Sequence, residues 1–338
     1  KKLEAAELEH RLENEVIDEA RHGYEFLRDH CIDKENGGIF WSMTYDGKPL
    51  DTTKHTYNQA FCIYALSSYY DASGDEEALK LAKELQLLIE SKCTDEIGYL
   101  EAFTKDFQPE SNEKLSENGV LAEKTMNTLL HVFEAYTEFY RVSHDEEVGE
   151  RLKWIMDVFA DKVYNPKLKR QEVFFDKNYN TIIDLYSYGH DIETAWLMDR
   201  GVEVLGDDHY KEKMSPITET LAENVYEVAF DGHSLANECC KGEVNDRRIW
   251  WVQAETVIGF LNEYQKHPQK TKFLEASEAE WEFIKEHVID KRTGSEWFWE
   301  VYPDGSPIAD RPIVEPWKCP YHNGRMCMEV IRRMKDAS

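Results

Sequence analysis

The sequence lacks several features that would place it in a familiar class. Its seven cysteines are an odd number and include no CxxC pair, so we expect reduced thiols in a cytoplasmic protein rather than a disulfide framework. No apolar run approaches the roughly 18 residues of a membrane span, and the charged segment 1–21 has no apolar signal core. We therefore expect no membrane partner.

Signatures for nucleotides and metals are missing as well. The chain contains no P-loop, no GxGxxG and no HExxH sequence, so we expect neither a metal nor any other cofactor. Basic residues are few, since 40 Lys and Arg stand against 67 Asp and Glu and give a formal net charge of −27. A surface this negative repels phosphate backbones and anionic lipids, so nucleic acid is not an expected partner.

Aromatic residues, by contrast, are abundant, with 9 Trp, 18 Tyr and 15 Phe making up 12% of the chain. Rings in such number need a core or a ligand to cover them. No linker rich in Pro, Gly or Ser divides the sequence, so we expect a single domain over 1–338.

Hydrophobic periodicity predicts helices that come in pairs, a richly apolar one followed by an amphipathic one. Short aromatic segments with turn residues separate the pairs, and two of these segments contain Asp-Gly, a hairpin signal. The expected helix pairs are 57–70 with 76–89, 125–141 with 145–159, 190–205 with 210–230, and 251–264 with 271–288. A first helix over 3–31, a last helix over 321–334 and hairpins at 37–51, 98–108, 172–184 and 294–310 complete the pattern.

The apolar helices carry His55, His131, His190, Trp251 and His322, at intervals of roughly 60 to 75 residues. A helix–hairpin–helix repeat cannot bury its apolar face alone and must stack on its neighbours. Closing the stack into a ring leaves no exposed end. We therefore predict an all-α (α/α) toroid whose short hairpins gather at one end. Because the first helix resembles an outer one, we expect the first inner helix to lie outside the sequence.

Two groups of residues on these helices are candidates for a catalytic site. His190 and Glu193 are three residues apart, share a helix face and are followed on it by Trp196. Trp251 and Glu255 are four apart on another buried helix, where a carboxylate must hold a partner or a ligand because burying it unpaired is costly. Ordinary core packing is the alternative interpretation for both. Asp191, near its helix start, is expected to favour the positive end of the helix dipole.

Two further helices also place a histidine beside polar side chains. His322 and Asn323 open the last helix after a proline-rich loop, and His131 has Asn127 one turn before it and Glu134 three residues after it. Aromatic platforms beside polar groups suit sugar rings, and histidines suit proton abstraction and return near neutral pH. A satisfied core histidine remains the alternative for His131.

Several long strings resemble the signatures of cellobiose 2-epimerases, a family within the N-acylglucosamine 2-epimerase superfamily, from about Arg21 to the C-terminal end. That resemblance implies an (α/α)6 barrel and cofactor-free epimerisation at C2 of the reducing-end glucose of β-1,4-linked disaccharides. The strings are KHTYNQAFCIYALSSYY, KTMNTLLHVFEAYTEFYR, SYGHDIETAWL, WWVQAE and PWKCPYHNGRM.

The resemblance also implies roles for individual residues. After ring opening, His190 and His322 would move the C2 proton through a cis-enediolate, and His131 would bind the oxygens of that intermediate. Glu193 and Glu255 would orient histidines and sugar hydroxyls. The substrate-binding residues would be Trp251, Trp317, Trp196, Tyr57, Asn58 and Asn127.

One departure from the family pattern concerns the N-terminus. The family carries an arginine on its first inner helix in a stretch like SRILWF, and the chain instead begins KKLEAAELEHRLENEV. If that segment is truly absent, we expect an incomplete barrel and little activity.

Other functions stay open. Within the superfamily, aldose–ketose isomerisation of a monosaccharide or N-acylglucosamine 2-epimerisation are alternatives. A glycoside hydrolase on the same toroid would need two catalytic carboxylates, and a non-enzymatic helical-repeat scaffold would present an exposed concave face. We expect a monomer or a weak homo-oligomer.

Overall fold

The computed structural model describes residues 15–308 and 310–336. The chain divides into two compact units, and each is described by itself. Unit 1 comprises Lys1–Val158, Phe174–Ile182 and Val204–Gly206, and unit 2 comprises Phe159–Val173, Ile183–Glu203 and Asp207–Ser338. Within the described part of the chain, every helix is too short or too polar to cross a membrane.

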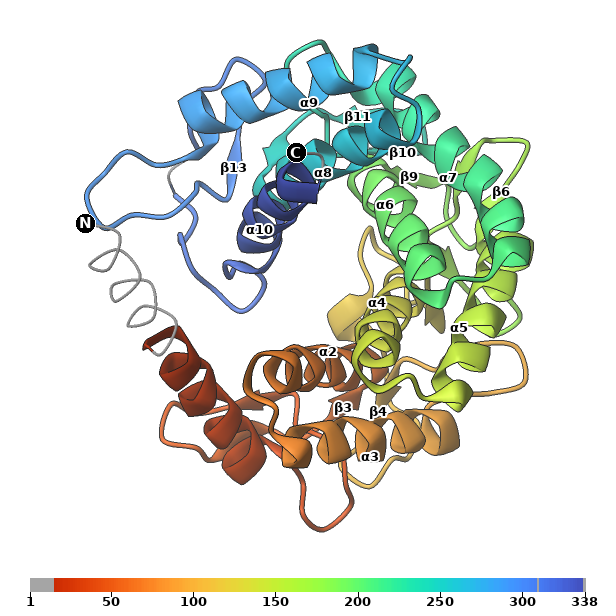
Figure 1. Ribbon diagram of the computed structural model, residues 1–338, viewed down its shortest axis with the longest axis vertical. Coiled ribbons are helices and arrows are strands. Elements are labelled where there is room, and N and C mark those ends of the chain that lie inside the picture. The colour runs from red at the N-terminus through yellow and green to blue at the C-terminus, as the bar shows by residue number, and fades with distance from the viewer. Residues whose placement is uncertain (1–14, 309, 337–338) are drawn as a thin grey trace. The chain divides into compact units, whose positions relative to one another are not determined.

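Unit 1 is built from two successive helix pairs. The apolar helix α2 lies beside both α3 and α4, and α4 lies beside α5 (Figure 1). Most of α4 is buried, whereas α3 and α5 bury one stripe each, as the alternation in the sequence predicts. The helices are α2 (Thr56–Ser73), α3 (Glu76–Lys92), α4 (Met126–Ser143) and α5 (Glu146–Val158), preceded by a helix over 15–26 and the π-helix η1 (Leu27–Cys31). The part of the predicted first helix over 3–14 lies outside the described residues.

Short antiparallel strand pairs precede the apolar helices of unit 1 and anchor their first turns. His55 is the second residue of such a strand and the N-cap of α2, so its expected place within the helix is wrong by one residue. Thr125 likewise precedes α4, and its side chain accepts a bond from Thr128 N at 3.0 Å. The pairs are β1 (Ser42–Met43) with β2 (Pro49–Asp51), β3 (Lys54–His55) with β4 (Ala102–Phe103), and β5 (Lys124–Thr125) with β8 (Phe174–Phe175), and η2 (Glu113–Leu115) is a 3-10 turn.

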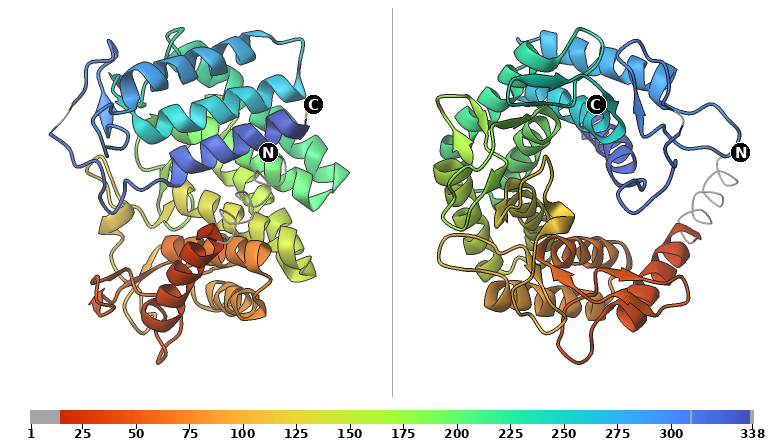
Figure 2. Two further views of the ribbon diagram at one scale, coloured as in Figure 1. Left: turned by 60° about the vertical axis from the view of Figure 1, so that its left-hand side comes forward. Right: turned by 180° about the vertical axis from the view of Figure 1, so that it is seen from behind.

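Unit 2 continues the same alternation, and α8 lies beside both α9 and α10 (Figure 2). The predicted helix over 271–288 is present, but its last turn widens into a π-helix. The helices are η3 (Phe159–Val163), α6 (Tyr188–Leu205), α7 (Asp208–Ala229), α8 (Trp250–Lys266), α9 (Lys272–Phe283), η4 (Ile284–Val288) and α10 (Tyr321–Asp336). Its strands are β6 (Tyr164–Asn165), β7 (Arg170–Gln171), β9 (Leu185–Ser187), β10 (Glu238–Cys240), β11 (Glu243–Asn245), β12 (Arg248–Ile249) and β13 (Glu300–Val301). β9, β10 and β11 form one antiparallel sheet, and β6 pairs with β7 and β12 with β13.

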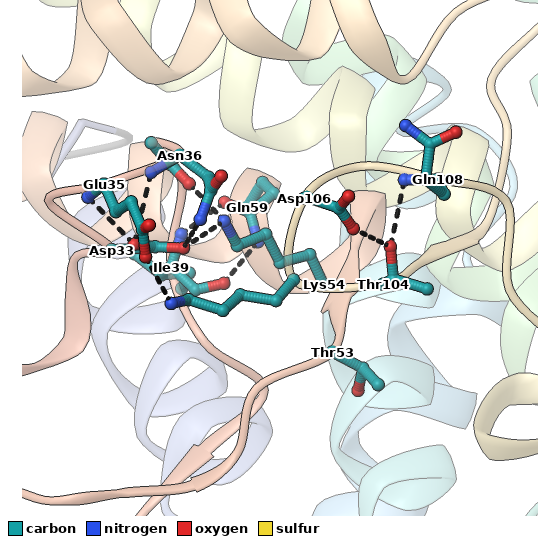
Figure 3. Close-up of polar contacts among 12 residues, drawn as sticks. Asp33, Glu35, Asn36, Ile39, Thr53, Lys54, Gln59, Thr104, Asp106 and Gln108 are labelled. Carbon is teal, nitrogen blue, oxygen red and sulfur yellow. Dashed lines mark hydrogen bonds and ion pairs between the residues drawn. The ribbon is translucent and has the colours of Figure 1, made fainter.

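At three places an ion pair connects the segment after an outer helix to the strand before the next apolar helix. In unit 1, Asp33 and Lys54 are fully or almost fully buried and their charged atoms lie 2.8 Å apart (Figure 3). Similar pairs recur as Asp95 with Lys124 at 2.7 Å and, in unit 2, as Asp231 with Arg248 at 2.5 Å, where the cation is buried but the carboxylate is 34% and 43% exposed. The repeated unit predicted from the sequence is thereby confirmed at the level of side chains.

The predicted hairpins also share one turn geometry. In each, a backbone N–H donates to the carbonyl four residues later, and the fourth residue of the turn has a positive φ. Glycine fills that left-handed position in two turns (Gly47 and Gly305), and an aromatic residue fills it in the other two (Phe107 and Tyr179). Figure 3 includes the second of these turns. The turns are 44–48, 104–108, 176–180 and 302–306.

Candidate active site

Unit 2 gathers the acid and base residues of three helices around one buried carboxylate. Glu255 of α8 is fully buried, and its Oε1 lies 2.7 Å from Nδ1 of His322 on α10. Its other oxygen accepts a 2.8 Å hydrogen bond from Nε1 of Trp196 on α6. Both carboxylate oxygens are therefore committed, and the imidazole of His322 is held in one orientation with Nε2 turned away from Glu255.

Arg325 completes this group, and the sequence reasoning did not identify it. Its Nη2 lies 2.8 Å from Oε1 of Glu193 and 2.7 Å from Oε1 of Glu255, and its guanidinium lies over the ring of Trp196 at 4.9 Å. Arg325 is three residues after His322 on α10, so the helical spacing that connected His190 with Glu193 was available as a signal here too.

The charges in this group compensate one another. Burial acts to raise the pKa of Glu255, but the nearby Arg325 and His322 outweigh burial and hold its pKa below the ordinary value. Two buried carboxylates thus face one permanent cation and one imidazole, which becomes the second cation when it is protonated.

The indole of Trp251 connects the two predicted catalytic histidines. Its ring centroid lies 4.7 Å from that of His190 and 5.4 Å from that of His322. Trp251 and Glu255 are one turn apart on α8, so the same helix positions the aromatic surface and the carboxylate. Trp317, in the loop before α10, is 45% exposed.

The start of α6 is fixed from two sides, and this places His190. Gln171 of β7 donates from Nε2 to the His190 carbonyl at 3.1 Å and to Asp191 Oδ1 at 2.9 Å. Ser187, the residue before α6, has its Oγ 2.7 Å from Nδ1 of His190. Burial raises the pKa of Asp191 well above its ordinary value. Hydrogen bonds from Gln171 act in the opposite direction and hold the carboxyl group beside the first turn of α6.

Unit 1 holds a second group around His131 of α4. Nδ1 of His131 lies 2.8 Å from Oε2 of Glu134, one turn along the helix, and both residues are almost fully buried. The rings of Tyr57 and Phe61 pack against the imidazole at 5.2 and 4.9 Å. Asn127 Oδ1 is buried and has no hydrogen-bond partner in the part of the chain that the structure describes.

Asn58, predicted to line the site, uses its amide to hold the start of α2. Its Oδ1 accepts from the backbone N–H of His55 at 3.0 Å, and its Nδ2 donates to the carbonyl of Phe40 at 3.1 Å. Both ends of the amide are thus engaged with backbone. The residue fixes the orientation of the turn that carries its neighbour Tyr57.

Two groups of side chains have the donor set for a metal ion among the residues that the structure describes, and protein cations already balance both. Ligand atoms of Glu193, Glu255 and His322 lie within 4.8 Å of one another, but Arg325 bridges the two carboxylates. The other group, Glu219 with Glu263 and His267, also bonds to lysines, since Lys270 Nζ lies 3.0 Å from Glu263 Oε1. A divalent ion would have to displace these cations, so neither group fits a metal well.

The model of the family described as N-acylglucosamine 2-epimerase (GlcNAc 2-epimerase) matches residues 5–323. A cellobiose 2-epimerase of Ruminococcus albus is 51% identical over 323 residues, which cover 96% of this chain and 83% of that protein. A cellobiose 2-epimerase of Dictyoglomus turgidum is 45% identical over 320 residues, which cover 95% and 82%.

Solved structures agree with these relatives. A sugar epimerase from a ruminal bacterium superposes with a TM-score of 0.93 at 51% identity, covering 94% of this chain and 82% of that one. A D-mannose isomerase superposes with a TM-score of 0.80 at 21% identity, covering 95% and 81%, and at that identity it shows the fold alone. The predicted all-α fold class, the (α/α)6 barrel with small strands, is confirmed by these likenesses.

Proposed function

Because the chain belongs to the N-acylglucosamine 2-epimerase family, we propose that His190 and His322, with the Glu193–Glu255–Arg325 group, form the catalytic centre of a C2 epimerase. The enzyme is a carbohydrate epimerase that acts on a disaccharide, and the name of its relatives identifies cellobiose as the substrate to test. The observation that supports this assignment best is the 2.7 Å contact of His322 Nδ1 with buried Glu255, beside a tryptophan that also packs on His190.

Two histidines suffice for the chemistry. When the sugar ring opens, the C1 carbonyl acidifies the C2 proton. One imidazole Nε2 takes that proton, and the C2–H electron pair forms the C1–C2 double bond of a cis-enediolate as charge moves onto O1. The other histidine, protonated, gives a proton to the opposite face of C2, and the electrons on O1 re-form the carbonyl. Histidine serves in both roles because its ordinary pKa is near neutrality.

Glu255 supports this role of His322. An ionised carboxylate only accepts hydrogen bonds, so Nδ1 of His322 must carry the proton and Nε2 is left to act on the sugar. Glu193, joined to Glu255 through Arg325, adds negative charge that favours the imidazolium. Trp251 and the exposed Trp317 offer surfaces for sugar rings, and Trp196 holds Glu255 in place.

The group on unit 1 is proposed to bind substrate oxygens. Glu134 fixes His131 through Nδ1 at 2.8 Å, which leaves Nε2 to bond to a sugar oxygen. The unsatisfied Oδ1 of Asn127 can accept a bond from a sugar hydroxyl. Tyr57, packed on the His131 ring, would line the same surface, with Asn58 holding its backbone.

The proposal also covers the cofactor requirement, the cellular location and the oligomeric state. Proton transfer between histidines needs no cofactor, and Arg325 supplies positive charge beside the carboxylates, so dialysis against EDTA should leave turnover unchanged. The seven cysteines all lie within the described residues and are free thiols, which favours a cytoplasmic protein. A monomer or weak homo-oligomer remains our expectation.

The decisive experiment is incubation with cellobiose in heavy water. We expect a glucosyl-mannose product that carries deuterium at C2. Release of free glucose would instead show a hydrolase, a ketose product would show an isomerase, and an epimer without deuterium at C2 would contradict the two-histidine mechanism. His190→Ala and His322→Ala should each lose turnover by about 100-fold or more, whereas His22→Ala, at an exposed position, serves as the matched control.

A further inference from the structure

The two histidines of the proposed centre differ in what contacts their Nδ1 atoms. A buried carboxylate lies 2.7 Å from Nδ1 of His322, and a serine hydroxyl, Ser187 Oγ, lies 2.7 Å from Nδ1 of His190. Carboxylates accept only, whereas a hydroxyl both donates and accepts. The two imidazoles are therefore held in different ways.

Ser187 is well suited to hold a ring, because its own position is fixed. It ends strand β9, where it is paired with Glu238 of β10, and it is only 6% exposed. The following residue, Tyr188, donates its N–H to the Asn237 carbonyl at 3.2 Å. The backbone on both sides of the hydroxyl is thus tied to the neighbouring strand.

The comparison with α4 shows that this contact is particular to α6. Thr125 stands immediately before α4, as Ser187 stands before α6, and it caps the backbone N–H three residues later at 3.0 Å. Such capping is the usual role of Ser or Thr at this position. Ser187 directs its hydroxyl to the ring of the residue three later, and that residue is the proposed catalytic histidine.

We propose that Ser187 is a positioning residue for the epimerisation, which accepts a hydrogen bond from Nδ1–H of His190 and so presents Nε2 to C2 of the sugar. This inference rests on the proposed function. Both working forms of His190, the neutral base and the imidazolium acid, carry a proton on Nδ1, so one accepting hydroxyl serves the two. Without it, Nδ1 loses this accepting partner and the neutral form can place its proton on Nε2, where the ring cannot act as a base.

The test uses exchange of the C2 hydrogen in heavy water, because the histidine on the face that carries this hydrogen can exchange it alone. The two epimers of the disaccharide present the C2 hydrogen to different histidines, so each histidine is tested with its own epimer. Ser187→Ala is expected to lower kcat for epimerisation by about 10- to 100-fold, the usual effect of losing a bond that orients a histidine, with KM little changed. Ser187→Thr, which retains the hydroxyl, should recover most of kcat. Ser67→Ala, which removes a buried hydroxyl bonded to Ile63 O at 2.7 Å, is the control for loss of a buried serine.

A double-mutant cycle separates positioning from general damage. In a His322→Ala background, with the epimer whose C2 hydrogen faces His190, Ser187→Ala should lower the exchange rate by about the factor by which it lowers kcat in the intact enzyme. In a His190→Ala background, with the other epimer, it should leave the exchange rate unchanged. Equal losses in the two backgrounds, or a variant with full kcat and only a lower melting temperature, would overturn the proposal and leave Ser187 as a helix cap. Failure of the wild-type enzyme to exchange C2 at all would overturn the proposed function as well, which distinguishes the two failures.

Discussion

Gly189 and Trp251 approach each other so closely that a side chain on the glycine would displace the indole or the neighbouring Val252. A Cβ built on Gly189 would lie 2.7 Å from Cη2 of Trp251, well inside van der Waals contact. Because Trp251 also packs on His190 and His322, its displacement is transmitted to both histidines. The missing side chain at Gly189 is thus a condition for the geometry of the proposed centre.

We predict that Gly189→Ala lowers kcat/KM for epimerisation by at least about tenfold, because small displacements of reacting groups cost about that much or more. Steady-state assays on cellobiose measure the effect. Gly23→Ala is the control, since its Cβ would meet nothing within 4 Å and its φ is not positive. Full activity of Gly189→Ala would show that Trp251 can shift without disturbing the histidines.

A second prediction concerns the cation between the buried carboxylates. Arg325→Met should lower the free energy of unfolding at pH 7 by about 3–5 kcal/mol, because two buried carboxylates lose their compensating charge. The pKa of Glu255 is held below its ordinary value of 4.5 in the folded protein. Its ionised form therefore stabilises the fold above that value, and this contribution is lost as the pH falls through the lowered pKa.

The loss caused by Arg325→Met should accordingly be smaller at pH 4 than at pH 7, as measured by urea unfolding of both proteins. Arg21→Met, which removes an exposed guanidinium whose partner Asp18 is exposed as well, should change stability little at either pH. An Arg325 variant with wild-type stability at pH 7 would mean that the carboxylates find another partner.

Much of the fold is readable from the sequence because periodicity reports burial directly. The boundaries predicted for the helix pairs lie within a few residues of those observed, and two of the four hairpin turns fall where Asp-Gly indicates. The π-helical ends of α9 and of the first helix were not predicted, since hydrophobic spacing does not distinguish a widened last turn from a regular one.

The site was predictable where its residues share one helix and not where they come from several. His190 with Glu193, and Trp251 with Glu255, follow from spacing alone. The contacts of Arg325 with Glu193 and of Trp196 with Glu255 join residues 132 and 59 positions apart, and only the packing of α6, α8 and α10 brings them together. Likewise, nothing in the local sequence shows that Ser187 contacts an imidazole rather than a backbone N–H.

A third prediction tests the buried ion pair of the first hairpin. Lys54→Met should lower the free energy of unfolding by about 3–5 kcal/mol, because Asp33 would remain buried without its cation. Lys48→Met is the matched control, since it removes a lysine that is 76% exposed and pairs with Asp46 at 2.5 Å, and surface pairs contribute about 0–1 kcal/mol. Equal effects of the two substitutions in urea unfolding would contradict the importance assigned to burial.

The last prediction concerns Glu101, whose buried carboxyl group stands at the start of α4. It accepts bonds from Thr125 N and Thr128 Oγ1, both at 2.6 Å, yet burial outweighs these bonds and raises its pKa from 4.5 to about 7. The folded protein therefore binds this proton more tightly than the unfolded chain. Raising the pH from below 4.5 to above 7 should remove stability on the order of 3 kcal/mol through this group.

Glu101→Gln should abolish that contribution while keeping both bonds, because an amide oxygen still accepts from Thr125 N and its NH2 can donate to Thr128. The difference in unfolding free energy between variant and wild type is then expected to grow in favour of the variant between pH 5 and pH 8, since the other titrating groups are common to the two proteins. Glu96→Gln, at an exposed position nearby, should show no such trend. Parallel stability curves for Glu101→Gln and wild type would mean that Glu101 is ionised at neutral pH and that α4 begins at a charged carboxylate.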